Sequence, residues 1–207
     1  MDGNYKYKNV TISGLPGGGS TTLLKLLREH LEFDGWRGFS GGEFMRAYAL
    51  EKGIFHEKGA LHHSAADYEE DFDRKIDMGM REKVQNEEKW ILESWLSGFM
   101  AQGVPDVLKI LVVCSDDAIR IDRIVNRDGA TVEDVKANIT KRYTDNNAKW
   151  TRMYKKQWQE WVVDRGLAKP DDPIDFWRPN LYDVCIDTYS TNKEQTFEAV
   201  LGHLQNG

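Results

Sequence analysis

One glycine-rich run, residues 10–27, constrains the fold of this chain more than any other stretch. It begins in a short β-prone segment, continues as a loop crowded with glycine, and ends in leucines at helical spacing. The loop glycines are Gly14, Gly17, Gly18 and Gly19, and the helix leucines are Leu23, Leu24, Leu27 and Leu31. Loop N–H groups and the positive end of the helix then face one cavity. The run therefore predicts an anion site, with a ligand-free turn as the alternative.

The loop matches the phosphate-binding pattern G-x-x-x-x-G-K-[ST] at every position except that of the lysine, which is Ser20. In the usual loop the lysine contacts the terminal phosphates, and the next hydroxyl holds Mg²⁺. Thr21 keeps that hydroxyl, and Thr22 follows it. The sequence thus predicts a nucleotide site with Mg²⁺ on Thr21, from which the central positive charge is missing.

Length and composition favour one domain that binds small molecules. The chain has 207 residues, enough for a single core with an inserted lid, and a net charge of -6 without a long basic run. General affinity for nucleic acid or acidic membranes is therefore not expected. No stretch approaches the roughly 18 apolar residues of a membrane span. Cys114 and Cys185 each lie in a hydrophobic run, which predicts buried, reduced thiols and a cytoplasmic protein.

Strand and helix patterns alternate along the rest of the chain, which predicts a parallel, doubly wound α/β sheet. Further strands are expected at 36–40, 90–92, 107–114 and 182–187. Helices are expected from about 43, at 68–88, 96–102, 117–127, from 131, at 150–161 and at 194–204. Within the weakly patterned stretch 48–67, the histidines His56, His62 and His63 are expected on the surface.

The glycine loop and the segments 40–46, 91–98, 120–128 and 182–188 follow one another in the order seen in cytidylate kinases. The chain resembles the short, archaeal-type branch of that family from residue 10 to 204. The resemblance implies a nucleoside monophosphate kinase fold with five parallel strands. It also implies a monophosphate-binding helical region at 43–88, an arginine-bearing lid at 127–150, and transfer of the ATP γ-phosphoryl group to CMP or dCMP.

The resemblance assigns site residues as well. Ser40 and Arg46 match positions that meet the nucleoside monophosphate, and Asp77 matches an acid on the covering helix, with an exposed helix aspartate as the alternative. The cations assigned to catalysis are Arg123, Arg127, Arg142 and Lys149. Arg120 shares a helix face with the first two and ranks below them, and Asp116 is expected to cap a helix rather than bind Mg²⁺.

Two departures from the family remove positive charge. Ser20 replaces the loop lysine, and Trp95 stands where the family has an arginine that reaches the acceptor phosphate. Loss of one preorganised charge contact costs about 10²–10³ in rate. Lys25, Lys149 or a lid arginine is a possible replacement; Lys25 is expected to point away, which favours a lid residue.

A third departure is the long link at 154–182, which is rich in aromatic residues: Trp158, Trp161, Phe176 and Trp177. Such side chains favour burial. They are expected to pack an extra helix on the same domain, with a dimer contact as the alternative, so a monomer is favoured.

The first functional hypothesis is an ATP- and Mg²⁺-dependent nucleoside monophosphate kinase acting on CMP or dCMP. Two alternatives stay open. One is a nucleotide-binding protein of this fold that has lost catalysis. The other is a kinase with a different acceptor, such as UMP, AMP or a small alcohol.

Overall fold

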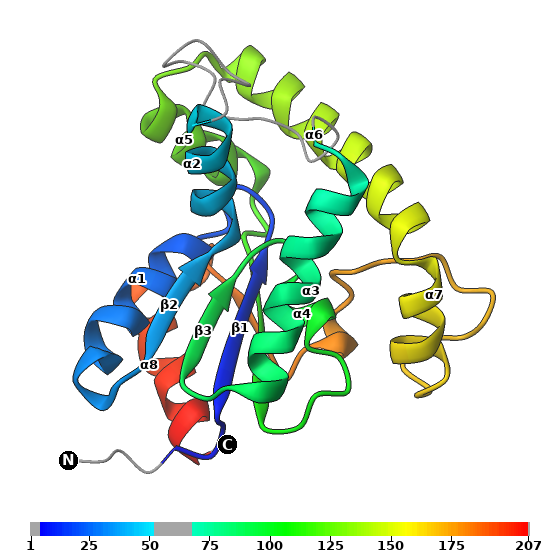
Figure 1. Ribbon diagram of the computed structural model, residues 1–207. Helices are drawn as coiled ribbons and strands as arrows, with labels where there is room; N and C mark the ends of the chain where they lie inside the picture. Colours follow the sequence, from blue (N-terminus) through cyan, green and yellow to red (C-terminus); the bar gives the residue numbers. More distant parts are fainter. Residues whose placement is uncertain (1–4, 52–67, 207) are drawn as a thin grey trace.

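The protein is built on one parallel sheet of five strands, in the order β2-β3-β1-β4-β5 (Figure 1). The computed structural model describes residues 5–51 and 68–206; the histidines at 56, 62 and 63 lie outside this range. The strands are β1 Asn9–Gly14, β2 Arg37–Ser40, β3 Trp90–Glu93, β4 Val107–Val113 and β5 Val184–Asp187. Every neighbouring pair is parallel. The predicted fold class is therefore confirmed.

Eight α-helices lie in the described part of the chain. They are α1 Ser20–Leu31, α2 Gly41–Glu51, α3 Glu70–Asn86, α4 Ser97–Met100, α5 Asp117–Asp128, α6 Val132–Met153, α7 Lys155–Trp158 and α8 Lys193–Asn206. Shorter turns are η1 Glu32–Asp34, the π-helical turn η3 Gln159–Val163, and η4 Pro179–Leu181. No described helix combines the length and the apolar character that a membrane span requires.

Two helix starts form as their sequences predict. The Asp116 carboxylate accepts from the Ile119 N–H at 2.9 Å, and the Thr131 hydroxyl accepts from the Asp134 N–H at 3.2 Å. Each bond satisfies an N–H group that lacks a partner inside its helix. Asp116 is thus a helix cap.

Helices cover both faces of the sheet, with α1 and α8 on one side and α3 and α4 on the other (Figure 1). The leucines of α1 fall on one stripe because they recur at helical spacing. They pack with β1, β4 and α8 into one core, while Met80 and Val84 of α3 pack on the opposite face. The central strands are consequently buried on both faces, which explains the continuous apolar run of β4.

The aromatic link packs on the same domain. Its side chains join α4 and α6 in a third core, named here the aromatic cluster: Phe99, Trp150, Tyr154, Trp158, Phe176 and Tyr182, flanked by Trp95, Trp161 and Trp177. Phe99, Tyr154 and Phe176 are fully buried. The chain from α7 to η4 therefore extends the domain beside α6, as the first alternative for this link predicted.

Two sequence expectations were wrong. Cys114 is buried but Cys185 is exposed, and both thiols are free. The reason is that Cys185 lies on β5, an edge strand whose alternate side chains face outward. In addition, α2 begins at Gly41 rather than near residue 43, directly after β2.

Truncating the core of the aromatic cluster tests its structural role. We expect Phe176→Ala to lower the free energy of unfolding by about 3–5 kcal/mol, because its buried ring lies 4.7 Å from that of Phe99. Phe33→Ala is the control: this ring is 97% exposed, and its loss should cost less than about 0.5 kcal/mol. Urea unfolding at two protein concentrations measures both. A midpoint that shifts with concentration would instead favour the dimer contact.

Candidate active site

Most of the predicted site residues meet in one cleft at the carboxyl ends of the strands. The cleft has a volume of about 790 Å³. Its lining includes Gly14, Gly17, Gly19, Ser20, Thr21, Thr22, Ser40, Arg46, Arg123, Arg127 and Arg142. This edge is where ligands bind in open α/β sheets, because the loops that follow the strands converge there. Gly18, Asp77 and Lys149 are not among the lining residues of this cleft.

The phosphate loop depends on two glycines with left-handed backbone angles. Gly17 has φ +82° and Gly19 has φ +102°, which other residues rarely adopt. A Cβ at Gly17 would also lie 2.7 Å from the Arg120 carbonyl oxygen. Gly19 directly precedes α1, and no described side chain caps that helix. The first N–H groups of α1 therefore face the cleft as an anion site.

Glu93 was not predicted from the sequence as a site residue. It lines the cleft between Ser20 and Ser40. Its Oε1 accepts from the Ser20 hydroxyl at 2.8 Å and its Oε2 accepts from the Ser40 hydroxyl at 2.7 Å. Burial raises the pKa of this carboxyl, while both hydroxyls and the charge of Arg46 act in the opposite direction. Glu93 directly follows the strand predicted at 90–92, and a charged residue at this ligand-binding edge of the sheet was the signal that could have identified it.

Oxygen ligands suitable for Mg²⁺ line the cleft. Thr21 and Glu93 both line it, and Mg²⁺ prefers hydroxyl and carboxylate oxygens together with waters and substrate phosphates. Within residues 5–51 and 68–206, no group of three histidine, cysteine or acidic side chains forms a closed metal site. The hydroxyl of Thr21 and the carboxyl of Glu93 are oxygen donors of the kind that fits Mg²⁺.

The arginines of α5 differ in their contacts. Arg123 donates to the Gly17 carbonyl at 3.2 Å and to the hydroxyl and carbonyl of Thr188 at 2.7 and 2.8 Å. It thus ties the phosphate loop to the segment after β5. Arg127 makes two bonds to Asp128, at 2.7 and 2.9 Å. Arg120 pairs with Asp117 and does not line the cleft.

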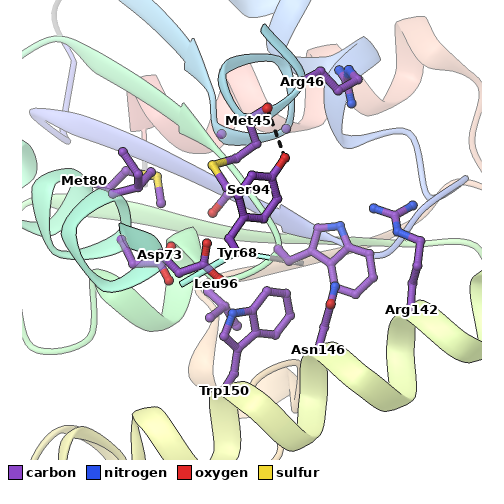
Figure 2. A pocket seen from close by; sticks show the side chains of 15 residues that line it. Met45, Arg46, Tyr68, Asp73, Met80, Ser94, Leu96, Arg142, Asn146 and Trp150 are labelled. Atoms are coloured by element: carbon purple, nitrogen blue, oxygen red, sulfur yellow. Dashed lines mark hydrogen bonds between the residues drawn. The ribbon is translucent and has the colours of Figure 1, made fainter. Parts of the chain in front are cut away.

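A smaller cavity of about 110 Å³ opens beside the cleft, between α2, α3 and α6. The residues shared by the two are Gly42, Arg46, Ser94, Trp95 and Arg142. Figure 2 shows Arg46 extending from α2 and Arg142 extending from α6. These two cations therefore lie where the cavities join, a place named here the junction.

Asp77 lines the smaller cavity and is partly buried, so the exposed-aspartate alternative was wrong. Its Oδ2 accepts from the Tyr154 hydroxyl at 2.7 Å. Burial raises the pKa of Asp77 to about 7 despite that bond. Burial and the Asp77 charge together raise the pKa of Tyr154 far above its usual value, so Tyr154 stays a donor.

Lys149 lies in a buried ion pair rather than in the cleft. Its ammonium donates to Asp73 Oδ2 at 2.8 Å and to the Tyr68 carbonyl at 2.7 Å. Both charged side chains are 6% exposed. Burial raises the pKa of Asp73, and the charge of Lys149 opposes that rise. Lys149 thus joins α6 to α3.

Lys25 is placed differently from the expectation. The sequence predicts that Lys25 points away from the site, whereas it lines the cleft on the second turn of α1. The expectation failed because the cleft extends along α1 beyond the phosphate loop, to Leu26 and to Lys193 of α8.

Comparison with known proteins places this site in a family. A family model described as "AAA domain" matches residues 10–145. The chain is similar to a cytidylate kinase of Methanosarcina mazei, with 32% identity over 190 residues that cover 91% of this chain and 92% of that protein. It is 42% identical to a cytidylate kinase of Methanosarcina barkeri over 120 residues, 58% of this chain and 62% of that one.

The solved structures agree on the fold. A gluconokinase from Sinorhizobium meliloti superimposes with a TM-score of 0.53 at 10% identity, covering 97% of this chain and 93% of that one. An uncharacterized protein from Eubacterium ventriosum gives a TM-score of 0.57 at 14% identity, covering 97% and 99%.

The buried ion pair leads to a prediction about Lys149. We expect Lys149→Met to lower the free energy of unfolding by about 3–5 kcal/mol, because Asp73 stays buried without its cation. The double variant Asp73→Leu/Lys149→Met should recover most of that loss. Lys141→Met, on the exposed face of the same helix, is the control and should change stability by less than about 0.5 kcal/mol. A Lys149→Met protein of unchanged stability but lost activity would assign this lysine to the phosphates.

Proposed function

The chain belongs to the cytidylate kinase family of P-loop proteins, and we propose that it transfers the γ-phosphoryl group of ATP to CMP or dCMP. The chain is an ATP-dependent nucleoside monophosphate kinase, and we propose that its preferred acceptor is CMP or dCMP. The observation that carries the proposal is the junction, where a cleft around a phosphate loop meets a smaller cavity at two arginines. Such an arrangement suits two phosphorylated ligands that meet end to end.

On the donor side, we assign the phosphates of ATP to the loop N–H groups and to the start of α1. Thr21 would hold Mg²⁺ together with the phosphates of ATP, and the ion would supply positive charge to the phosphate oxygens. Glu93 holds Ser20 in place by a bond of 2.8 Å and faces the same cleft as Thr21. Arg123 holds the phosphate loop through its hydrogen bond to the Gly17 carbonyl. Arg127 supplies positive charge to the cleft that it lines.

At the junction, Arg46 and Arg142 replace the positive charge that Ser20 does not provide. An oxygen of the acceptor phosphate attacks the γ-phosphorus, and the bond from that phosphorus to the β–γ bridging oxygen breaks, giving ADP and the nucleoside diphosphate. The transition state is loose, with charge spread over oxygens, so positioning and charge carry the catalysis. The planar guanidinium groups of Arg46 and Arg142 can each bind two phosphate oxygens through parallel N–H donors.

The helices around the smaller cavity bind the acceptor and exclude water. We assign the monophosphate site to the region 43–88, with Ser40 at its base, and the lid to 127–150. Lys149 acts here as a positioning residue, since its ion pair with Asp73 joins the lid helix to α3. Closure of such a lid favours transfer to the acceptor over hydrolysis of ATP.

We propose that Asp77 recognises the base of the acceptor nucleotide. Asp77 Oδ2 accepts a hydrogen bond from the Tyr154 hydroxyl. Asp77 lines the smaller cavity together with Asp73 and Asn146. An ionised carboxylate only accepts hydrogen bonds. It therefore suits the amino group of cytosine and opposes the carbonyl that uracil carries at the same place.

The direct test is phosphoryl transfer from ATP with Mg²⁺ to CMP, dCMP, UMP and AMP. We expect turnover with the cytosine nucleotides, and a fall of about 10²–10³ in kcat/KM for Arg46→Met. Arg152→Met, which removes an exposed arginine of α6 paired with Glu70, is the control and should leave kcat/KM unchanged. Absence of transfer to every acceptor, with ATP still bound and activity gained in Ser20→Lys, would favour a binding protein instead.

Exchange of Asp77 for asparagine tests the base assignment. We expect the ratio of kcat/KM for CMP to that for UMP to fall at least about tenfold in Asp77→Asn, because the amide can present N–H groups to uracil. In the wild type the ratio should rise between pH 6 and 8, since the carboxyl with a pKa of about 7 becomes ionised over that range. The ratio in Asp77→Asn should not change with pH.

Both acceptors carry the same phosphate, so its own titration cancels in this ratio. A ratio that is unaffected by the substitution would remove Asp77 from base recognition.

A further inference from the structure

We propose that Trp95 is a positioning residue that holds the Arg142 guanidinium at the junction, ready for the acceptor phosphate. The inference rests on the proposed function, because it concerns how the same site receives its acceptor. Trp95 does not itself exchange protons or donate a charge to the ligand. Its role is to fix where the charge of another residue lies.

The first observation is location. Trp95 and Arg142 both line the cleft and the smaller cavity. The Arg142 Cζ lies 5.3 Å from the centroid of the Trp95 ring. Tryptophan is the best aromatic partner of a guanidinium, which is attracted to the negative face of the ring. A guanidinium on that face keeps its N–H donors directed along its own plane, where a phosphate can accept them.

The second observation is how firmly Trp95 is held. Its carbonyl oxygen accepts from the Trp177 indole N–H at 2.9 Å. Its ring lies 6.1 Å from that of Trp177 and 5.4 Å from that of Trp150, edge to face in both cases. Edge-to-face aromatic pairs stabilise one relative orientation. The Trp95 ring is therefore fixed from two sides, one of them the aromatic link.

The third observation joins this support to the lid helix. The Trp177 ring lies 5.6 Å from that of Tyr143, the residue that follows Arg142 on α6. Trp150, which contacts both Trp95 and Trp177, belongs to the same helix. Trp177 thus contacts both Trp95 and the stretch of α6 that carries Arg142.

This arrangement lowers the cost of binding a phosphate. A long arginine side chain in water samples many rotamers, and ordering it on a ligand costs free energy. Contact with a fixed indole restricts those rotamers before the ligand arrives. Arg46, across the junction on α2, supplies the second cation from an independent element.

The test separates phosphate binding from base binding. Affinities of CMP and of cytidine are measured by calorimetry for the wild type and for Trp95→Leu. We expect CMP to bind roughly tenfold more weakly to Trp95→Leu, while cytidine, which lacks the phosphate, changes less than about twofold. Equal weakening of both ligands would make Trp95 a stacking surface for the base and would overturn the proposal.

Coupling to Arg142 gives a second criterion. In an Arg142→Met background, Trp95→Leu should weaken CMP binding no further, because the residue it positions is gone. Trp95→Arg in that background should regain CMP affinity, since it returns a guanidinium to the junction; a purely structural tryptophan would not be replaced in this way. Full additivity of the two losses, without regain, would contradict the proposal.

Two further variants guard against misfolding and unspecific loss. Trp177→Phe removes the N–H that donates to the Trp95 carbonyl but keeps a ring, and should raise the KM for CMP more than it lowers kcat. Trp161→Leu is the matched control, because Trp161 holds Arg81 at 3.8 Å in the same aromatic cluster but lines neither cavity. Its CMP affinity should equal that of the wild type. Phosphoryl transfer tests the proposed function separately, since the criteria measured by calorimetry hold or fail without turnover.

Discussion

The site depends first on one buried carboxylate. Glu93 ends β3 and accepts from Ser20, the first residue of α1, and from Ser40, the last residue of β2. Ser40 in turn accepts from the Glu43 N–H and so caps α2. A buried carboxyl group is tolerated only when its oxygens are hydrogen-bonded, and these two bonds hold the three chain segments in one geometry. The start of α1 and the end of β2 are therefore held relative to each other in the cleft.

A phosphate loop without its lysine makes the site depend on tertiary structure for positive charge. The arginines that line the cleft come from α2, α5 and α6, so their positions follow from packing rather than from the loop itself, while Lys25 and Lys193 line it from α1 and α8. Two hydrogen bonds tie α6 and the residue that follows it to α3: the buried bond from Lys149 to Asp73 and the partly buried bond from Tyr154 to Asp77. Both acids of these ties also line the smaller cavity. The packing of α6 and the shape of the smaller cavity therefore depend on the same contacts.

Local sequence patterns predicted the elements, because local physics forms them. The apolar run of β4, the caps at Asp116 and Thr131, and the glycine loop each depend on residues a few positions apart, and each is found where expected. Contacts between distant residues were out of reach. Lys149 finds Asp73 across 76 positions, and Ser20 finds Glu93 across 73. Spacing does not encode such partners, so a lysine that fits a charged lid turned out to be a buried tie.

The aromatic link shows how an extension can become part of a site without lining it. Tyr154 is its first residue and Trp177 lies in its second half; the Tyr154 hydroxyl donates to Asp77 and the Trp177 indole N–H donates to the carbonyl of Trp95. Both bonds come from side chains packed into the aromatic cluster, whose rings restrict one another. Groups held in this way lose little conformational freedom when a ligand binds. The packing of the aromatic link therefore keeps Asp77 and Trp95 ordered at the smaller cavity. The link thus supports the smaller cavity through two residues that line it, Asp77 and Trp95, without lining it itself.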